Sequence, residues 1–524
     1  MKRNAFRRML SLWPLLVCMV CLAVSVGVYA VYGQHNLDSD ISSEFVLAQL
    51  LNEEGRFFLT DEWYYSTELR IVSPVPVYQI ALRLFEDWHM ARTFSIAVLL
   101  AGVMASFVFL VRGVGVSMQA ALLCAAALVL PVSQYQAFTL TYGGFYTVCV
   151  MLTFIEIGLV LRMGKGKWLQ ALLLVLLGVY GGLNGVRMLM ICTAPLLVSC
   201  AIVFFLDARR CENLKKLTAL PSFGLLLGGI ICAAATGAGY VINSRVLAHA
   251  YDFAQYNETV LSPLTAQMFT DQIICLMRFF GYRDQVLLLS LQGVVSVLAA
   301  LLPAAGAAAA ALLLSMKLNA RERLLAVFTA AAMALGMVIN VLTLSKSGDA
   351  ALPYSVSYYM PAALLFVFAL FWVFDRFACK LRLLRVLPML ALVGVFILAN
   401  AAYREEDLNT YETELEDIAQ CLLDEGAYEG YATFWNANVL TEITDGEIGA
   451  FAVEDWKYGD MNEWLQRKEY FDRAPVGPIF AVFGEKEWKE DEPGYDSEKL
   501  IYASDAFYVV VYDTDEEFRE AMDW

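Results

Sequence analysis

The chain is poor in charged residues and in the side chains that most often bind metal ions. Only 17% of its 524 residues are charged, whereas soluble domains are roughly a quarter charged. Histidine occurs only three times, and no CxxC pair is followed by a second such pair. The composition therefore indicates an integral membrane protein, in which no zinc or iron–sulfur site is expected.

The C-terminal part of the chain lacks both cysteine pairs and positive charge. Only Cys421 of the 11 cysteines lies beyond residue 403, so no disulfide can form within that part. Residues 403–524 hold 33 Asp and Glu against 9 Lys and Arg. This negative charge repels nucleic acid and anionic lipid, so neither is expected as a partner there.

Long apolar runs are the most abundant feature of the chain. Hydrophobic residues make up 59% of it, and its mean hydropathy is +0.57. A helix of about 20 residues crosses a hydrocarbon core of roughly 30 Å. The sequence thus predicts an all-α polytopic membrane protein with about eleven transmembrane helices. They are expected at 10–32, 94–112, 117–134, 142–161, 168–183, 187–206, 219–241, 287–314, 324–344, 357–376 and 386–402.

Basic residues gather in five segments that share one side of the membrane if all eleven runs cross it. These are the N-terminus, 162–167, 207–216, 316–323 and 375–385. Basic loops face the cytoplasm, so we expect the N-terminus inside and both residues 33–92 and the chain from 403 outside. The first run ends at a signal-peptide-like VYA, but it is longer than the usual apolar region of about 7 to 15 residues and is expected to stay as an anchor.

About 60 residues separate the first two runs, more than a simple connection needs. This first outer loop opens with three carboxylates, Asp38, Asp40 and Glu44. Apolar residues then recur at helical spacing as far as Gly55, and 73–88 begins with two prolines, which a first helical turn tolerates. Both segments are predicted to be helices lying at the membrane surface.

Residues 403–524 are predicted to form a small α/β domain, separate from the transmembrane domain at 1–402. An acidic helix is expected at 405–424. The segments GYATFW, IGAFAVE, PIFAVFG and AFYVVVYD are rich in Val, Phe and Tyr and are predicted to be strands. No glycine-rich phosphate loop or nucleophile elbow occurs, so we expect an accessory or acceptor-binding role.

The layout of residues 1–402 resembles that of the C-type glycosyltransferases, whose members include protein O-mannosyltransferases and the aminoarabinose transferases of bacterial lipid A. Three segments carry the local resemblance: PVPVYQIALRLFEDWHMARTFS at 74–95, GGLNGVRMLMICTAPLL at 181–197 and SYYMPAALLF at 357–366. Relatives often have Lys-Pro-Pro where this chain has VSPVP at 72–76. The basic residue expected near the sugar phosphate is absent there, and Arg70 is the candidate to replace it.

The resemblance implies an inverting transfer of a sugar from a polyprenyl-phosphate donor to a glycan, lipid or protein acceptor at the outer membrane face. A carboxylate must take the proton of the acceptor hydroxyl, and positive charge must stabilise the leaving phosphate. Asp40 is the implied base and Asp38 its neighbour. Arg187, Arg92, Arg70 and Glu68 are the implied substrate- and phosphate-binding residues. Participation of a divalent cation stays open.

Simpler interpretations remain at this stage. Asp38 and Asp40 can merely favour a helix N-terminus, and Arg187 can be a snorkelling arginine. Two other classes of membrane protein also remain. A polysaccharide polymerase or ligase of the cell envelope usually carries its large outer loop between late spans. A transporter requires ionisable groups near mid-membrane and paired broken helices, which these runs scarcely show.

Overall fold

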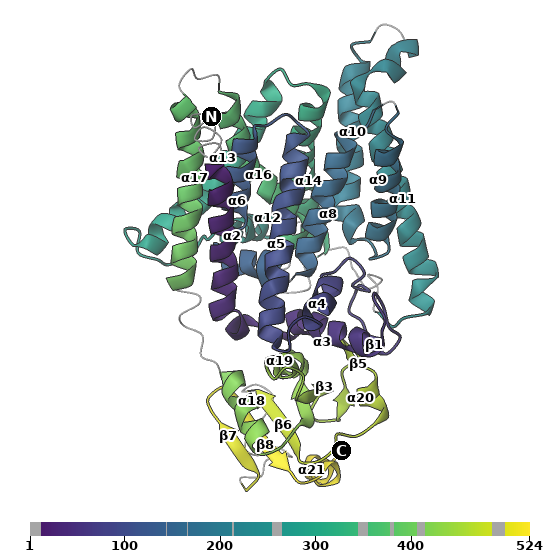
Figure 1. Ribbon diagram of the computed structural model, residues 1–524, viewed down its shortest axis with the longest axis vertical. Helices are drawn as coiled ribbons and strands as arrows, with labels where there is room; N and C mark the ends of the chain where they lie inside the picture. Colours follow the sequence, from purple (N-terminus) through teal and green to yellow (C-terminus); the bar gives the residue numbers. More distant parts are fainter. Residues whose placement is uncertain are drawn as a thin grey trace, which may run out of the picture.

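The computed structural model describes residues 12–142, 144–164, 166–211, 214–253, 265–343, 355–377, 382–405, 414–484 and 498–524. A long helical bundle carries a small sheet at one end, and the purple helices of the first loop lie between the two (Figure 1). This arrangement confirms the predicted fold class.

Every predicted transmembrane segment coincides with a helix. These helices are α2 (Trp13–Tyr32), α5 (Trp88–Arg112), α6 (Met118–Leu128), α8 (Phe145–Val160), α9 (Trp168–Gly182), α10 (Ala194–Ala208), α11 (Pro221–Arg245), α13 (Leu291–Ser315), α14 (Ala320–Thr343), α16 (Met360–Arg376) and α17 (Arg382–Tyr403). Within the described residues, seven helical stretches are long and apolar enough to cross a membrane, or eight if one bent pair counts as a span. The chain is thus a multi-pass membrane protein, and eleven crossings stay a prediction.

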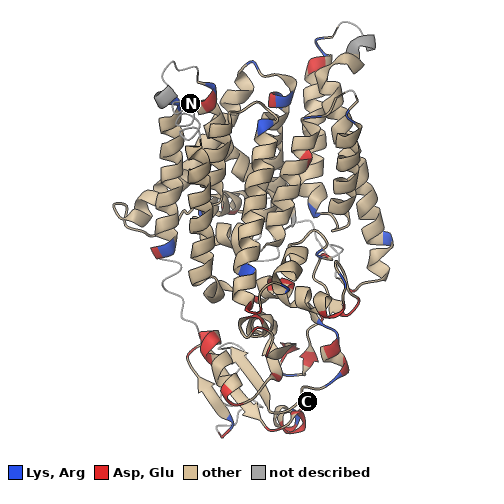
Figure 2. Cartoon of the chain, viewed as in Figure 1, with Lys and Arg blue, Asp and Glu red and all other residues tan. Residues whose placement is uncertain are grey.

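Three of the basic segments meet at the end of the bundle opposite the sheet. There Asp207 pairs with Arg323 at 2.5 Å, and Asp375 pairs with Arg385 at 2.7 Å. A third pair joins Glu322 to Arg376. Acidic side chains gather instead around the sheet at the other end (Figure 2). Residues 1–11, which hold the N-terminal basic segment, lie outside the described residues.

The first loop folds into helices at the two predicted places. Helix α3 (Ser39–Glu53) begins at Asp38, whose carboxylate accepts a hydrogen bond of 2.9 Å from the Ile41 amide. Helix α4 (Val75–Leu82) follows a short strand, β1 (Trp63–Tyr64). Most of α3 is buried, including its polar residues Ser39, Ser42, Ser43 and Glu44. It therefore lies inside the protein, between α4 and the C-terminal region, with no face left to solvent along most of its length.

The C-terminal region contains a six-stranded mixed sheet in the order β4-β3-β2-β6-β8-β7. Strand β2 runs parallel to β3 and β6, whereas β8 is antiparallel to β6 and β7. The strands are β2 (Glu429–Thr433), β3 (Gly449–Asp455), β4 (Asp460–Met461), β6 (Ile479–Gly484), β7 (Leu500–Ala503) and β8 (Phe507–Tyr512). Strands β2, β3, β6 and β8 confirm the four predicted ones.

Helices cover both faces of this sheet. Helices α18 (Glu414–Asp424) and α19 (Phe434–Ile443) enclose one apolar cluster, and α21 (Asp515–Met522) encloses another through Phe518. The acidic helix expected at 405–424 is seen as α18, and residues 406–413 lie outside the described residues. A short helix, α20 (Glu469–Asp472), completes the region.

The C-terminal region is joined to the first loop by a shared ladder and by ion pairs. Strand β5 (Gln466–Arg467) pairs antiparallel with β1. The Arg467 guanidinium donates two hydrogen bonds to the Glu53 carboxylate, at 2.8 and 3.1 Å. The Trp88 amide donates a bond of 2.7 Å to Asp445. The sheet therefore sits directly on the segment that contains the acidic stretch.

Alkaline phosphatase fused after Trp524 is expected to be active outside the cytoplasm, because this enzyme needs disulfides that form only in oxidising compartments. The expectation follows from the basic segments at the opposite end of the bundle. A matched fusion after Gly164, in the basic segment between α8 and α9, should be inactive. Enzyme activity measured in whole cells checks both, and the reverse pattern would contradict the orientation.

Candidate active site

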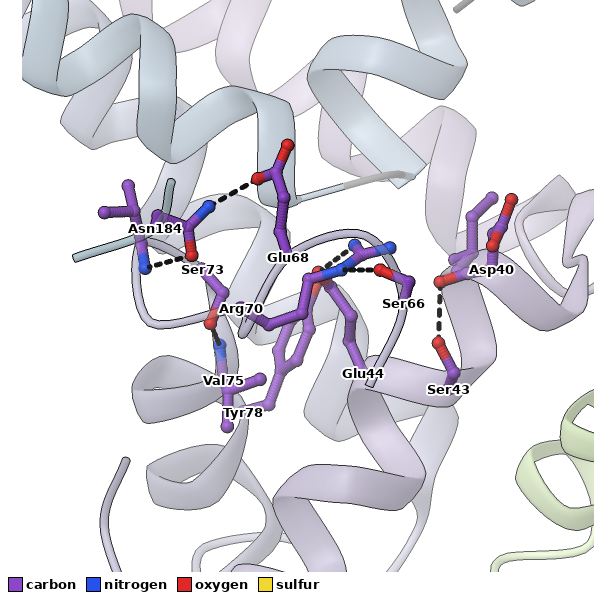
Figure 3. A network of polar contacts seen from close by, with 12 residues as sticks. Asp40, Ser43, Glu44, Ser66, Glu68, Arg70, Ser73, Val75, Tyr78 and Asn184 are labelled. Carbon is purple, nitrogen blue, oxygen red and sulfur yellow. Dashed lines mark hydrogen bonds and ion pairs between the residues drawn. The ribbon is translucent and has the colours of Figure 1, made fainter. Parts of the chain in front are cut away.

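The first turn of α3 brings Asp40 to a small polar pocket. Ser43 donates a hydrogen bond of 2.9 Å to the Asp40 carbonyl, which fixes the turn (Figure 3). The pocket is lined by Asp40, Ile41, Glu44, Arg70, Phe138, Phe145 and Tyr146. Its cavity volume of about 30 Å³ suits water, because one water needs roughly 10–15 Å³. A sugar requires the pocket to widen.

Asp38 titrates far above its ordinary range. Burial raises the pKa of its carboxyl from 3.8 to about 7, and the negative charge of Asp40 adds to the increase. The hydrogen bond from the Ile41 amide acts in the opposite direction but is smaller. Asp38 is therefore largely neutral below pH 7, so the two neighbouring carboxylates need not both be charged.

Arg70 reaches the pocket from the segment before α4. Its Nη1 donates a hydrogen bond of 2.9 Å to Glu44, and its Nε donates one of 3.3 Å to Ser66 (Figure 3). The backbone of Arg70 is left-handed, with φ +56°, which costs a non-glycine residue about 1–3 kcal/mol unless its surroundings impose it. Burial raises the pKa of Glu44 to about 7, although Arg70 opposes this shift.

Arg187, which lies in the segment before α10, contacts two aromatic residues of the pocket, Phe145 and Tyr146. The Arg70 guanidinium lies 4.5 Å from the Phe145 ring centre, and that of Arg187 lies 5.2 Å from the rings of both Phe145 and Tyr146. Arg187 Nε donates a hydrogen bond of 2.5 Å to Glu68, and both side chains are buried. The structure thus gathers Asp40, Arg70 and Arg187 around Phe145 and Tyr146, and Glu68 binds Arg187.

Asn184 is a site residue that the sequence interpretation missed. Its amide nitrogen donates to Glu68, and its oxygen accepts bonds of 2.9 and 3.3 Å from the Ile71 and Val72 amides (Figure 3). It lies in the turn GGLNGVR next to Gly185, whose φ of +90° favours glycine. Asn184 therefore fixes the backbone after Arg70. The signal available in the sequence was an amide side chain within a glycine-rich turn.

Arg92 lies on the other side of the first turn of α3 and does not line the pocket. Its side chain is fully buried, and its Nη2 donates a hydrogen bond of 2.7 Å to Glu442 of α19. Nη2 also lies 3.3 Å from the Ile41 carbonyl, and Nη1 lies 3.5 Å from the Tyr78 hydroxyl. Arg92 is therefore not one of the residues that line the pocket, although its charge acts on Asp38.

A cation site would need several ligands close together. Among the described residues, no three His, Cys, Asp or Glu side chains converge in a way that could hold a metal ion.

The chain matches no protein-family model and no curated protein, but solved structures align with most of it. The Archaeoglobus fulgidus oligosaccharyltransferase in its apo form covers 92% of this chain and 70% of its own, with 15% identity and a TM-score of 0.50. ArnT from Cupriavidus metallidurans, bound to undecaprenyl phosphate, covers 94% of this chain and 97% of its own, with 12% identity and a TM-score of 0.42. Mycobacterial arabinofuranosyltransferase AftD covers 88% of this chain and 33% of its own, with 13% identity and a TM-score of 0.42.

The first of these alignments shows a shared fold. The chain has the fold of the C-type glycosyltransferases, which confirms the resemblance stated from its sequence.

Raising the pH from about 5 to about 8 is expected to lower the melting temperature, and Asp38→Asn should reduce this decrease. The folded protein holds a proton on Asp38 up to about pH 7, whereas an ordinary carboxyl loses it near 3.8. The stability that this proton contributes is fully present below the lower value and is lost as the pH rises through the upper one.

Thermal unfolding of the purified protein, followed by tryptophan fluorescence across this pH range, measures the effect. Glu44 has a raised pKa as well, so the variant should keep part of the slope. Equal slopes in the variant and the wild type would contradict the assignment.

Proposed function

We propose that the protein transfers a sugar from a polyprenyl-phosphate donor to an acceptor hydroxyl at the outer face of the membrane. The observation that carries this proposal is the gathering of one carboxylate and two arginines around Phe145 and Tyr146. They come from three separate segments and meet at the end of the bundle near the C-terminal sheet. The C-type glycosyltransferase fold supports the same reaction class.

Asp40 acts as the general base in this proposal. Its carboxylate takes the proton of the acceptor hydroxyl while the acceptor oxygen forms a bond to the anomeric carbon of the sugar. The bond from that carbon to the phosphate oxygen breaks, and its electron pair leaves with the lipid phosphate. Attack from the opposite face inverts the configuration. Asp38, largely neutral below pH 7, reduces the repulsion that a second charge would place beside Asp40.

Arg70 and Arg187 stabilise the charge that develops on the departing phosphate. Preorganised positive groups are effective because they need no reorientation during the reaction. Glu44 and Glu68 provide this order by holding the two guanidinium groups against the Phe145 ring. Glu68 is accordingly a positioning residue for Arg187, and Arg70 replaces the lysine of the relatives. A phosphate role for Arg92 is not part of the proposal, because its guanidinium is fully buried among Glu442, Phe45 and Tyr78.

Asp40→Asn is expected to reduce sugar transfer by about 100- to 10,000-fold, the usual contribution of general-base catalysis. Asparagine keeps the size of the side chain but accepts no proton. Asp38→Asn should reduce transfer less, because Asp38 only tunes its neighbour and asparagine still caps a helix. The assay follows transfer from a polyprenyl-phosphate sugar in membranes, with melting temperature as a control for folding. Near-normal turnover in Asp40→Asn would remove Asp40 as the base.

A Glu68→Gln/Arg187→Gln double variant is expected to bind the lipid phosphate about 10- to 100-fold more weakly, since a hydrogen bond to a charged group contributes about 1.5–3 kcal/mol. Replacing both partners avoids leaving one charge buried and unpaired. The exposed Arg83, which contacts Asn52, gives the matched control Arg83→Gln. Binding of a fluorescent polyprenyl phosphate measures both, and equal affinities would exclude Arg187 from the phosphate site.

A further inference from the structure

A buried ion pair connects the C-terminal region to the first turn of α3. Arg92 of α5 is fully buried and Glu442 of α19 is 4% exposed, although 350 residues separate them in sequence. Both oxygens of the Glu442 carboxylate accept hydrogen bonds, one from Nε and one from Nη2 of the arginine. This two-point contact fixes the plane of the guanidinium as well as its position.

Arg92 contacts one of the two residues that flank Asp40, and helix α19 contacts the other. Arg92 Nη2 donates a hydrogen bond of 3.3 Å to the carbonyl of Ile41. On the other side, the Asn438 amide of α19 donates one of 3.3 Å to the hydroxyl of Ser39. Helix α19 therefore holds one neighbour of Asp40 directly and the other through the arginine that it orients.

Aromatic rings close the space around the guanidinium. Its central carbon lies 4.5 Å from the ring centre of Phe45 and 5.1 Å from that of Tyr78. Taking both charges out of water is costly, so a buried pair of this kind contributes little net stability and mainly selects one geometry. Glu442 holds Arg92 through two hydrogen bonds, whereas Asp38 and Glu44 interact with it through charge.

We propose that Glu442 is a positioning residue for the transfer reaction, acting through Arg92 on the backbone that carries Asp40. The C-terminal region is then a working part of the site and not only an accessory domain. The inference rests on the proposed function for its catalytic consequence. The structural part of the inference, that Glu442 orders the first turn of α3, does not depend on which reaction the protein catalyses.

The test compares Glu442→Gln with Arg467→Gln. The second variant removes the ion pair to Glu53, which lies at the C-terminal end of α3, far from Asp40. A misplacement of about 1 Å can cost about 100-fold in rate, so kcat of Glu442→Gln should fall about 10- to 100-fold. KM for the lipid donor should change little, because Arg70 and Arg187 are untouched. Arg467→Gln should keep kcat near the wild-type value.

In Glu442→Gln, Arg92 loses its counter-charge, and the protein could misfold for that reason alone. A second variant controls for this effect. The double variant Arg92→Met/Glu442→Leu replaces the pair by apolar side chains, an exchange that buried pairs usually tolerate. It should melt near the wild-type temperature and still show the loss in kcat. A folded double variant with unchanged kcat and KM, in a protein whose activity depends on Asp40, would overturn the positioning role.

Amide hydrogen exchange separates this inference from the proposed function. Exchange at residues 38–45 should rise at least several-fold in Glu442→Gln, while the rest of α3 and the Arg467→Gln protein stay near the wild type. If Asp40→Asn proves fully active, the assignment of Asp40 as the base fails, but the exchange result still decides whether Glu442 orders the turn. Equal exchange in Glu442→Gln and Arg467→Gln would overturn the ordering role.

Discussion

Buried charge must be paired, and this constraint determines how the layer between bundle and sheet is assembled. Two arginines are buried there and a third, Arg70, is largely buried, and each meets a glutamate: Arg70 with Glu44, Arg187 with Glu68, and Arg92 with Glu442. The partners are 26, 119 and 350 residues apart in sequence. Because an unpaired charge at such a depth costs several kcal/mol, each pair fixes one long-range contact. Together they hold the first loop to the bundle and the sheet to the first loop.

The same pairing makes the site rigid and limits what it can bind as it stands. Arg70 and Arg187 are oriented before any phosphate arrives, but Glu44 and Glu68 already neutralise part of their charge. A phosphate must therefore share these arginines with the glutamates, and a sugar must widen a pocket of about 30 Å³. The raised pKa of Glu44 makes the sharing of Arg70 easier, since protonation of the Glu44 carboxyl leaves the charge of Arg70 uncompensated. Lower pH should thus favour the phosphate complex through this residue.

Much of the architecture could be predicted from the sequence because its signals are local. Apolar runs of membrane length identified the long helices of the bundle from α2 to α17 that were predicted as transmembrane, and Val-, Phe- and Tyr-rich segments identified four strands. Ion pairs between distant residues leave no such periodic signal, so Glu442 was not recognised as the partner of Arg92. Helix α3 was expected at the membrane surface because apolar residues recur at helical spacing between Asp40 and Gly55, but its polar residues Ser39, Ser42, Ser43 and Glu44 are buried as well. Ser39 and Glu44 are buried with partners from distant segments, because Ser39 accepts a hydrogen bond from Asn438 of α19 and Glu44 accepts one from Arg70.

The overall charge of the C-terminal region does not explain how it is attached. At the rim of the interface this acidic region contributes cations, Arg467 and Lys468, to carboxylates of the membrane part, Glu53 and Asp252. The buried ion pair instead uses an acid of the region, Glu442. Exposed pairs are worth little and are screened by salt, whereas a pair closed off by aromatic rings is screened far less. High ionic strength should therefore loosen the rim while Arg92 and Glu442 keep α19 seated on the first turn of α3.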